Sequence, residues 1–241
     1  MTPIIDNSGK GNHGSNNGVI PYAGISSKGA YGTANKYISA GQVGNPALST
    51  GTTISVWVKE TATYEYVSNF QRIIAKNNAC SYGQETGWIL TRYTGNCRWW
   101  FKGNSLNAGI NDIDTAWHHL VLVFGTDLVA RSYCDGVFVA SASYSSDIGN
   151  THNLALFNTS DGTAAFNGYI DEFLIINRAL SDSEIRGLYL GKSLPKLYTM
   201  ADYQLTQMAS DGVITPQEKI GVVSRWCEIV NDSNRISALP T

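Results

Sequence analysis

The stretch FNGYIDEFLIINRALSDSEIRGLY, residues 166–189, changes from one apolar spacing to another and decides the fold class. Its first part, 168–176, is rich in aromatic and β-branched residues, which predicts a strand. The strict alternation of inward apolar and outward polar residues fails at Asp171 and Glu172. Either both faces of this strand are buried, or a β-bulge at these two residues resets the register.

The second part of the same stretch predicts one short helix. Ser181 is followed three residues later by Glu184, the spacing of a capping box, in which each residue satisfies a backbone amide at the start of a helix. Leu180 and Ile185 are spaced for a hydrophobic staple, and Gly191 is placed to end the helix. The chain therefore passes from strand to helix within a few residues.

Strand-like runs separated by Gly, Asn, Ser and Thr also occupy the rest of the chain before residue 180. They predict two packed antiparallel sheets. Asp135-Gly136 lies between two such runs and favours a type I′ hairpin turn that pairs Cys134 with Val137. The runs lie at 53–58, 87–93, 97–101, 117–124 and 153–157.

Composition narrows the possible functions. The chain has 241 residues, of which 43% are hydrophobic and 15% charged, with a formal net charge of -2. This charge argues against a nucleic-acid binder that works by neutralising phosphates. No stretch approaches 18 consecutive apolar residues, so we expect no membrane insertion, and no signal peptide is visible. The four cysteines form no CxxC pair, which favours reduced thiols over the alternative, a Cys80–Cys97 disulfide.

Four segments together carry a family resemblance. They are DNSGKGNHG at 6–14, WHHL at 117–120, YCDGVFV at 133–139 and the opening stretch at 166–189. In this order they resemble the laminin-G-like jelly roll of the concanavalin A-like lectin/glucanase superfamily, over about residues 5–190. The resemblance implies a mainly β, two-sheet antiparallel jelly-roll sandwich that binds carbohydrate or protein. Members usually open with an apolar strand, whereas here only PII precedes Asp6. We expect the sandwich to occupy 1–191.

The superfamily includes glucanases, so the spacing of the acidic residues bears on whether this chain is an enzyme. A retaining glycosidase needs two carboxylates about 5–5.5 Å apart, which alternate positions of one strand supply. Among Glu60, Glu65, Glu85 and Glu172, no two hold alternate positions of a predicted strand, and Asp171 is adjacent to Glu172. We therefore expect no enzyme activity, with a glycoside hydrolase of the same fold as an alternative.

An aromatic and polar cluster is the predicted glycan-binding site. Aromatic rings stack on the C–H faces of sugars, while Arg and Asn side chains hydrogen-bond hydroxyls. The alternative is that these aromatics pack in the core, which we expect for Trp57 and Trp117. The polar loop 76–87 is a candidate rim. The predicted ligand-binding residues are Tyr82, Trp88, Arg92, Tyr93, Asn96, Arg98 and Trp99.

A structural calcium ion is implied by the resemblance, because lectin-like jelly rolls frequently hold one between loops. The candidate ligands are Asp6, Asn7 and Asp171, which offer the oxygen atoms that calcium prefers. The alternative is local: Asp6 and Asn7 cap a turn, and Asp171 hydrogen-bonds to the N-terminal loop, for example to His13.

Residues 192–241 differ from the sandwich and predict a helical hairpin. Apolar residues recur at helical spacing, and Thr215, Pro216 and Glu218 form a capped helix start. Residues 203–230 resemble a helical segment of bacteriophage tail-fibre and tail-tip proteins. This implies a connector that binds other tail subunits and makes the chain a homo-oligomer.

The combined expectation is a lectin-like module of a phage or prophage virion structural protein. It would bind a cell-surface glycan and assemble in the host cytoplasm. A bacterial extracellular adhesion module, located at the cell surface, is the alternative.

Overall fold

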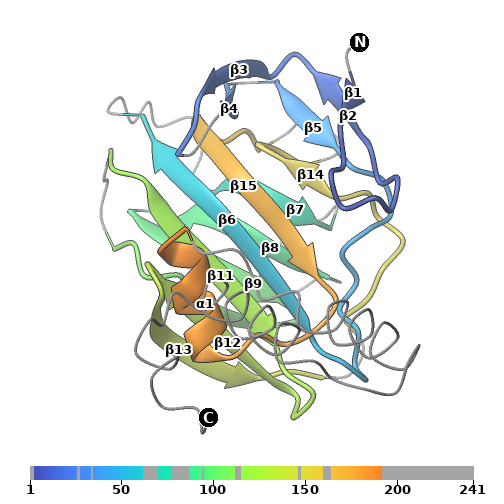
Figure 1. The fold of residues 1–241 in the computed structure, drawn as a ribbon, viewed down its shortest axis with the longest axis vertical. Helices are drawn as coiled ribbons and strands as arrows, with labels where there is room; N and C mark the ends of the chain where they lie inside the picture. The colour runs from blue at the N-terminus through green and yellow to red at the C-terminus, as the bar shows by residue number, and fades with distance from the viewer. Residues whose placement is uncertain are drawn as a thin grey trace, which may run out of the picture. The chain divides into compact units, whose positions relative to one another are not determined.

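Strand β15 (Gly168–Ile176) lies inside a seven-stranded antiparallel sheet of the computed structural model (Figure 1), with the order β13-β12-β11-β6-β15-β4-β3. The second sheet, as far as the described residues show it, has eight strands in the order β1-β2-β5-β14-β7-β8-β9-β10. The predicted two-sheet sandwich is therefore confirmed. The structure describes residues 3–25, 28–33, 35–61, 70–77, 87–93, 95–111, 115–145, 148–159 and 164–191.

The strands of the two sheets are mostly short. Those of the seven-stranded sheet, besides β15, are β3 (Ile20–Ala23), β4 (Lys28–Gly32), β6 (Thr52–Glu60), β11 (His118–Phe124), β12 (Val129–Cys134) and β13 (Val137–Ser143). Those of the eight-stranded sheet are β1 (Pro3–Ile4), β2 (Gly14–Asn17), β5 (Tyr37–Ser39), β7 (Phe70–Lys76), β8 (Trp88–Tyr93), β9 (Asn96–Phe101), β10 (Asn104–Asn107) and β14 (Ala155–Leu156).

The irregularity expected in β15 is a β-bulge. Its pairing with β6 shifts between Asp171 and Leu174, and Glu172 adopts a φ of 45°. A left-handed conformation is uncommon for a non-glycine residue, and a bulge is one of the places where it occurs. The bulge holds Ile170 toward the core while the apolar end of the strand continues in a new register.

The core lies between the two sheets and follows the predicted periodicity. Ile54, Val56 and Val58 on β6 are all buried on the inner face, and β11 is buried on both faces from His119 onward. A fully buried large apolar side chain contributes about 1.5–3 kcal/mol relative to an exposed one. The largest fully buried apolar side chains are Trp88, Trp99, Phe101, Phe124, Phe157 and Phe166.

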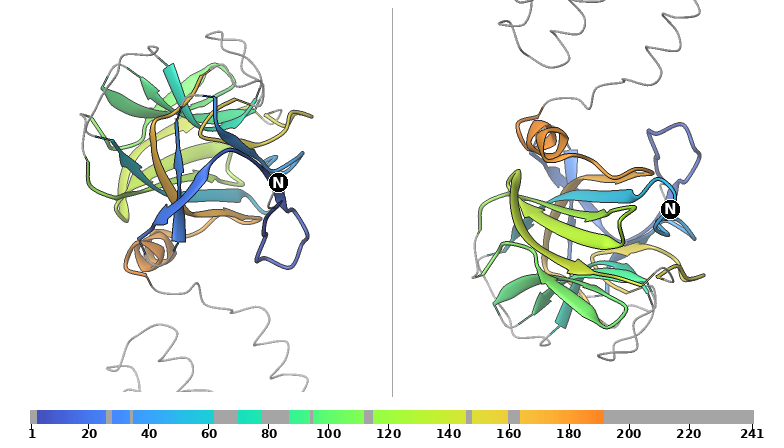
Figure 2. Two further views of the ribbon diagram at one scale, coloured as in Figure 1. Left: turned by 90° about the horizontal axis from the view of Figure 1, so that it is seen from above. Right: turned by 90° about the horizontal axis from the view of Figure 1, so that it is seen from below.

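The predicted turn and helix are also confirmed. Asp135 and Gly136 have φ values of 51° and 77°, and Cys134 pairs with Val137. Helix α1 (Asp182–Tyr189) begins with the capping box, because the Ser181 amide donates to Glu184 Oε2 at 2.9 Å. The first turn of α1 lies on the outer side of the seven-stranded sheet (Figure 2), where the hydroxyl of Tyr133 donates to Asp182 Oδ1 at 2.8 Å.

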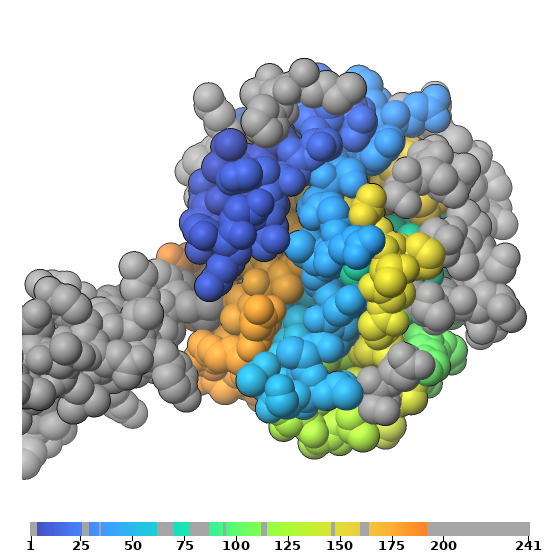
Figure 3. All heavy atoms as spheres, turned by 90° about the vertical axis from the view of Figure 1, so that its right-hand side faces the viewer, coloured from blue at the N-terminus to red at the C-terminus, as the bar shows by residue number. Residues whose placement is uncertain are grey.

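The N-terminal segment completes the edge of the eight-stranded sheet. The first described strand, β1, has two residues. It pairs with β2, and β2 pairs with β5, so that the first residues (dark blue) lie against those around 37–50 (lighter blue) in Figure 3.

The C-terminal predictions lie outside the described residues. The compact unit that contains the sandwich covers Met1–Ile185. The expected hairpin in 192–241, and the resemblance over 203–230, fall where the structure gives no description. Within the part of the chain that it does describe, no helix is long and apolar enough to cross a membrane.

Candidate functional site

The strands β6, β15, β4 and β3 run side by side in the seven-stranded sheet (Figure 1). Their outer face carries several aromatic rings and the side chain of Lys59. On β6, Val58 faces the core, so the neighbouring Trp57 and Lys59 face outward. On β15, Ile170 faces the core and Tyr169 faces outward. Because Tyr169 pairs with Lys59 on one side and with Tyr31 on the other, outward side chains of three strands meet.

Four rings form what we call the tyrosine platform: Tyr22, Tyr31, Trp117 and Tyr169. The ring centroid of Tyr169 lies 4.5 Å from that of Tyr22, 4.9 Å from that of Tyr31 and 6.3 Å from that of Trp117. These spacings are within the range of favourable aromatic pairs. Tyr22, on the edge strand β3, is 48% exposed, while the other three rings are half-buried.

Polar groups surround the tyrosine platform. Lys59 Nζ lies 5.7 Å from the centroid of Tyr169, at cation–π distance, and the Tyr31 hydroxyl donates to Asn167 Oδ1 at 3.2 Å. Burial, together with the neighbouring Tyr22, raises the pKa of Tyr169. This phenol therefore stays protonated at neutral pH, when it can both donate and accept hydrogen bonds.

This arrangement can bind a ligand that has both an apolar face and hydroxyl groups. The rings rest on a sheet whose other face is the core, so they are held in place before any ligand arrives. Holding contact groups in position lowers the conformational entropy that binding costs. Aromatic rings with polar edges suit the alternating C–H and O–H surfaces of sugars.

Two of the predicted binding residues lie in the core. Trp88 and Trp99 are fully buried between the sheets, their ring centroids are 6.2 Å apart, and the Trp88 indole donates to the Gly44 carbonyl at 2.7 Å. This corrects the interpretation of these two rings as a stacking surface, because neither ring face reaches solvent. The alternative expectation, that the aromatic rings pack in the core, is the correct one for Trp88 and Trp99.

A third predicted binding residue, Arg92, is also buried. Its Nε lies 3.0 Å from Glu60 Oε2, and Cys97 donates to the other oxygen of Glu60 at 3.7 Å. Burial raises the pKa of Glu60, while Arg92 opposes this effect. Arg92 therefore balances a carboxylate inside the sandwich instead of contacting a ligand at the surface.

The remaining predicted residues lie on the outer face of the eight-stranded sheet. Tyr93 stacks on Phe70 with centroids 4.4 Å apart, and Asn96 and Arg98 are half-buried on the adjacent β9. These three side chains share the sheet face opposite to Trp88, because β8 and β9 alternate sides. Tyr82 lies outside the described residues.

The calcium candidates have hydrogen-bond partners within the chain. The Asp6 carboxylate accepts from the amides of Ser8 and Asn12, both at 2.9 Å. Hydrogen bonding by the Ser8 side chain and by these amides lowers the pKa of Asp6. The Asp171 carboxylate accepts from the amides of Ile25 and Glu172. Asp6 thus caps a turn, whereas Asp171 bonds to the residues after β3. Asn7 lies in the same exposed loop as Asp6, and calcium binding by Asp6, Asn7 and Asp171 stays a prediction.

Two further expectations concern the cysteines, expected as reduced thiols, and the glutamates, expected not to form a catalytic pair. Cys97 and Cys134 are free, which accords with reduced thiols, while Cys80 and Cys227 lie outside the described residues. Glu60 is engaged with Arg92 inside the sandwich. Glu65 and Glu85 also lie outside the described residues.

The tyrosine platform cannot be recognised from any single stretch of the sequence, because its members are distant in the chain. Trp57 and Trp117 were expected in the core, whereas both are half-buried and Trp117 contacts Tyr169. One available signal was the glycine-flanked tyrosines Tyr31, in GAYG, and Tyr169, in GYI, each placed one residue from a position that faces inward.

Two of the solved structures with a similar fold are binding domains of larger proteins. The binding domain of Paraclostridial Mosquitocidal Protein 1 is 19% identical, with a TM-score of 0.61, and the alignment covers 76% of this chain and 48% of that one. The botulinum neurotoxin serotype D binding domain is 16% identical, with a TM-score of 0.60, covering 78% and 49%. The chain thus spans about half the length of these domains.

The family of this chain follows from its match to a protein-family model. Comparison with curated proteins finds no matching relative. The family model described as "Concanavalin A-like lectin/glucanases superfamily", of the Laminin_G_3 type, matches residues 32–186, which is more than half of the chain. The jelly-roll sandwich, its strand order and this match together show that the chain belongs to the concanavalin A-like lectin/glucanase superfamily.

Proposed function

We propose that this sandwich is a non-catalytic, lectin-like module that binds a cell-surface glycan through the tyrosine platform. One observation carries the proposal: Tyr22, Tyr31, Trp117 and Tyr169 meet on one sheet face, with Lys59 and Asn167 beside them. The superfamily and the binding-domain neighbours support a surface-binding role.

A glycan-array screen followed by calorimetry on the best ligand tests this proposal. Tyr22→Ala and Tyr169→Ala each remove one ring, and each should weaken binding at least tenfold, which corresponds to about 1.4 kcal/mol. Tyr22→Phe keeps the ring and separates stacking from the hydroxyl contribution. Tyr93→Ala, on the outer face of the other sheet, tests the cluster predicted from the sequence and should bind normally if the tyrosine platform is the site. Unchanged affinity in folded Tyr22→Ala and Tyr169→Ala protein would exclude this face as the site.

The non-catalytic assignment rests on the carboxylates described above. Glu60 is paired with Arg92, and both oxygens of Asp171 accept backbone hydrogen bonds. Glu172, at the bulge, is the exposed carboxylate beside Asp171. Incubation with polysaccharides should therefore release no reducing ends. Cleavage that disappears in Glu172→Gln would establish the glycoside hydrolase alternative instead.

We further propose that the module is carried by a phage or prophage tail protein and is located in the virion. The support is the resemblance of residues 203–230 to tail-fibre and tail-tip segments, which also motivates contacts with tail subunits. A bacterial extracellular adhesion module remains the second candidate. Antibody labelling of induced virions and of the cell surface distinguishes the two, because a tail protein labels particles and an adhesin labels cells.

A further inference from the structure

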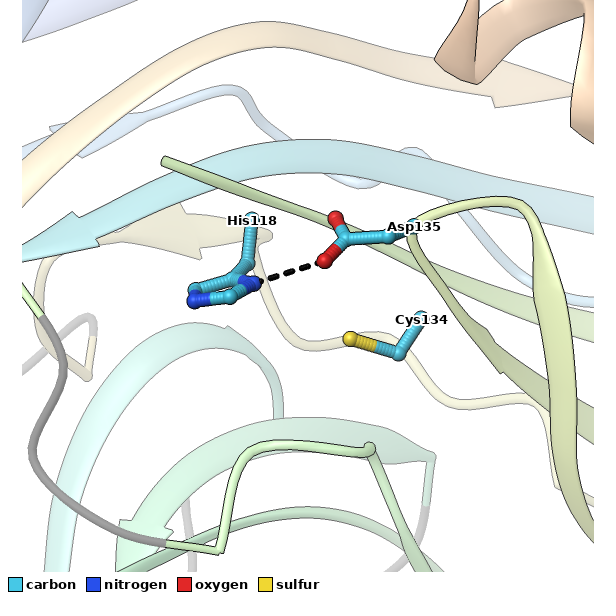
Figure 4. A group of neighbouring side chains, drawn as sticks. All are labelled: His118, Cys134 and Asp135. Atoms are coloured by element: carbon cyan, nitrogen blue, oxygen red, sulfur yellow. Dashed lines mark hydrogen bonds and ion pairs between the residues drawn. The ribbon is translucent and has the colours of Figure 1, made fainter. Parts of the chain in front are cut away.

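A histidine, a cysteine and an aspartate meet where β11 begins and the β12–β13 hairpin turns (Figure 4). His118 is the first residue of β11, Cys134 is the last of β12, and Asp135 follows in the turn. One potential ligand atom from each residue lies within 4.8 Å of the other two, and all three residues are half-buried. Three different kinds of donor atom therefore share one small space.

The hairpin turn fixes the aspartate. Asp135 occupies the first central position of the type I′ turn, and its amide donates to the His119 carbonyl at 2.8 Å. Asp135 Oδ1 accepts from the His119 amide, also at 2.8 Å, while Oδ2 lies 2.8 Å from His118 Nδ1. One carboxylate oxygen is thus held by the backbone, and the other is directed at the imidazole.

The cysteine is held in place from both sides. Cys134 pairs with Leu120 of β11, and its Cβ would lie 2.2 Å from a Cβ added at Gly109. Gly109, with a φ of 101°, therefore lets the chain after β10 pass close over Cys134. The thiol is free, and Figure 4 shows the three side chains turned toward a common space.

We propose that His118, Cys134 and Asp135 bind a zinc ion that joins the start of β11 to the β12–β13 turn. Imidazole nitrogen, thiolate sulfur and carboxylate oxygen are the ligands of zinc, at about 2.0–2.3 Å. A thiolate favours zinc over calcium or magnesium, which prefer oxygen ligands only. The site lies beyond the glycan-binding role and uses none of the residues of the tyrosine platform.

Charge and access are compatible with a divalent cation. A neutral imidazole, a thiolate and a carboxylate carry two negative charges, which Zn²⁺ balances. The side chains of His118 and Asp135 are 20% and 31% exposed, so an ion can enter from solvent. Three protein ligands leave a fourth tetrahedral position for water. On binding, the Sγ–H bond of Cys134 breaks, its proton passes to solvent, and a Zn–S bond forms without any change of oxidation state.

Cobalt(II), which takes the place of zinc in such sites, gives a direct readout on the full-length protein. A thiolate ligand produces a sulfur-to-cobalt charge-transfer band in the near ultraviolet, so titration should reveal this band, and zinc should then displace it. Cys134→Ser should abolish the band. Asp135→Asn and His118→Gln should weaken cobalt binding at least tenfold, because loss of even outer-shell partners costs 10–100-fold.

Two features keep the experiment decisive. Asp135→Asn retains the turn, since Asn-Gly also favours type I′, so it reports on the ligand even if another variant fails to fold. His152→Gln and Cys227→Ser remove a histidine and a thiol that have no part in the proposed site, and both should keep the band. Zinc should also raise the melting temperature of the parent but not of Asp135→Asn. The proposal is overturned if no band forms, if Cys134→Ser keeps it, or if the controls lose it equally.

Discussion

The carboxylate of Asp171 accepts a hydrogen bond from the backbone amide of Ile25, 146 positions earlier in the chain, at 2.8 Å. Its other oxygen accepts from the amide of Glu172, inside the β15 bulge. The bulge is thus linked to the residues that follow β3, the edge strand that carries Tyr22. A feature that resembles an irregularity in the strand therefore helps to position one ring of the tyrosine platform.

Gly24→Ala tests this link. An added Cβ at Gly24 would lie 2.0 Å from Asp171 Oδ2 and 2.7 Å from the backbone nitrogen of Gly29, so the backbone has to move. We expect a loss of about 1–3 kcal/mol in the free energy of unfolding, measured by urea denaturation. Gly149→Ala is the control, because its nearest neighbours would be at ordinary contact distances of 3.7 Å or more. Equal stabilities of the two variants would contradict the close approach at Asp171.

The buried Glu60–Arg92 pair leads to a pH-dependent prediction. Arg92→Met leaves the Glu60 carboxylate without its cation, and breaking such a pair by removing one partner costs about 3–5 kcal/mol. Burial already raises the pKa of Glu60, and removing Arg92 raises it further. When a carboxyl group has a higher pKa in the folded than in the unfolded protein, the free energy of unfolding falls as the pH rises above the unfolded pKa, which is 4.5 for Glu.

The Arg92→Met defect should therefore be large at pH 7 and shrink as the pH is lowered and Glu60 gains a proton. The double variant Glu60→Gln with Arg92→Met removes the buried charge altogether and should recover most of the stability at pH 7. Thermal unfolding at several pH values measures both effects. A defect that is independent of pH, and that persists in the double variant, would mean that Arg92 acts through packing alone.

The sequence predicted the parts of the fold that have a clear apolar period. β6, β11 and the hairpin turn at Asp135 follow directly from alternation and turn chemistry. β2 (GSNN) and β10 (NSLN) could not be predicted in this way, because they have few apolar side chains and form through pairing with neighbours that are already placed. Gly14 of β2, for example, packs directly against Ile38 of β5.

The site was harder to predict than the fold, for a related reason. Alternating aromatics in β8 and β9 show that two faces exist, but not which face is the core. The register buries Trp88 and Trp99 and leaves Tyr93 on the outer face. The tyrosine platform depends on the pairing of β3, β4 and β15, which are distant in sequence. The meeting of His118 with Asp135 likewise requires the β11–β12 register.

The effect of pH on glycan binding provides a further test of the tyrosine platform. A phenol with the usual pKa of 10 already keeps most of its protons at pH 9, and burial raises the pKa of Tyr169 further, so its hydroxyl stays protonated over this range. We expect the dissociation constant for the best array ligand to change little between pH 7 and pH 9. Tyr169→Phe, which cannot ionise, should give the same flat profile. Weaker binding at pH 9 in the parent, absent in Tyr169→Phe, would contradict the raised pKa.

The last prediction concerns residues 192–241. Their predicted helices carry an apolar stripe that includes Leu197, Leu205 and Met208, and a stripe of this kind is buried against another surface in a soluble protein. The sandwich has its own core, and α1 ends at Tyr189, before this segment. The Gly191 amide then donates to the Leu188 carbonyl at 3.1 Å. A shortened chain that ends at Lys192 should therefore fold, bind the same glycan and lose self-association.

Light scattering and thermal unfolding of the full and shortened chains measure these outcomes together. A much lower melting temperature of the shortened chain would mean that the C-terminal segment covers part of the sandwich, which would then be incomplete without it. If both chains are monomeric and equally stable, the expected oligomer through these helices is wrong, and the stripe would have to be buried by a different partner, such as the tail subunits proposed above. Replacing Leu205 with Gln in the full chain separates these cases, because it weakens a contact between copies without shortening the chain.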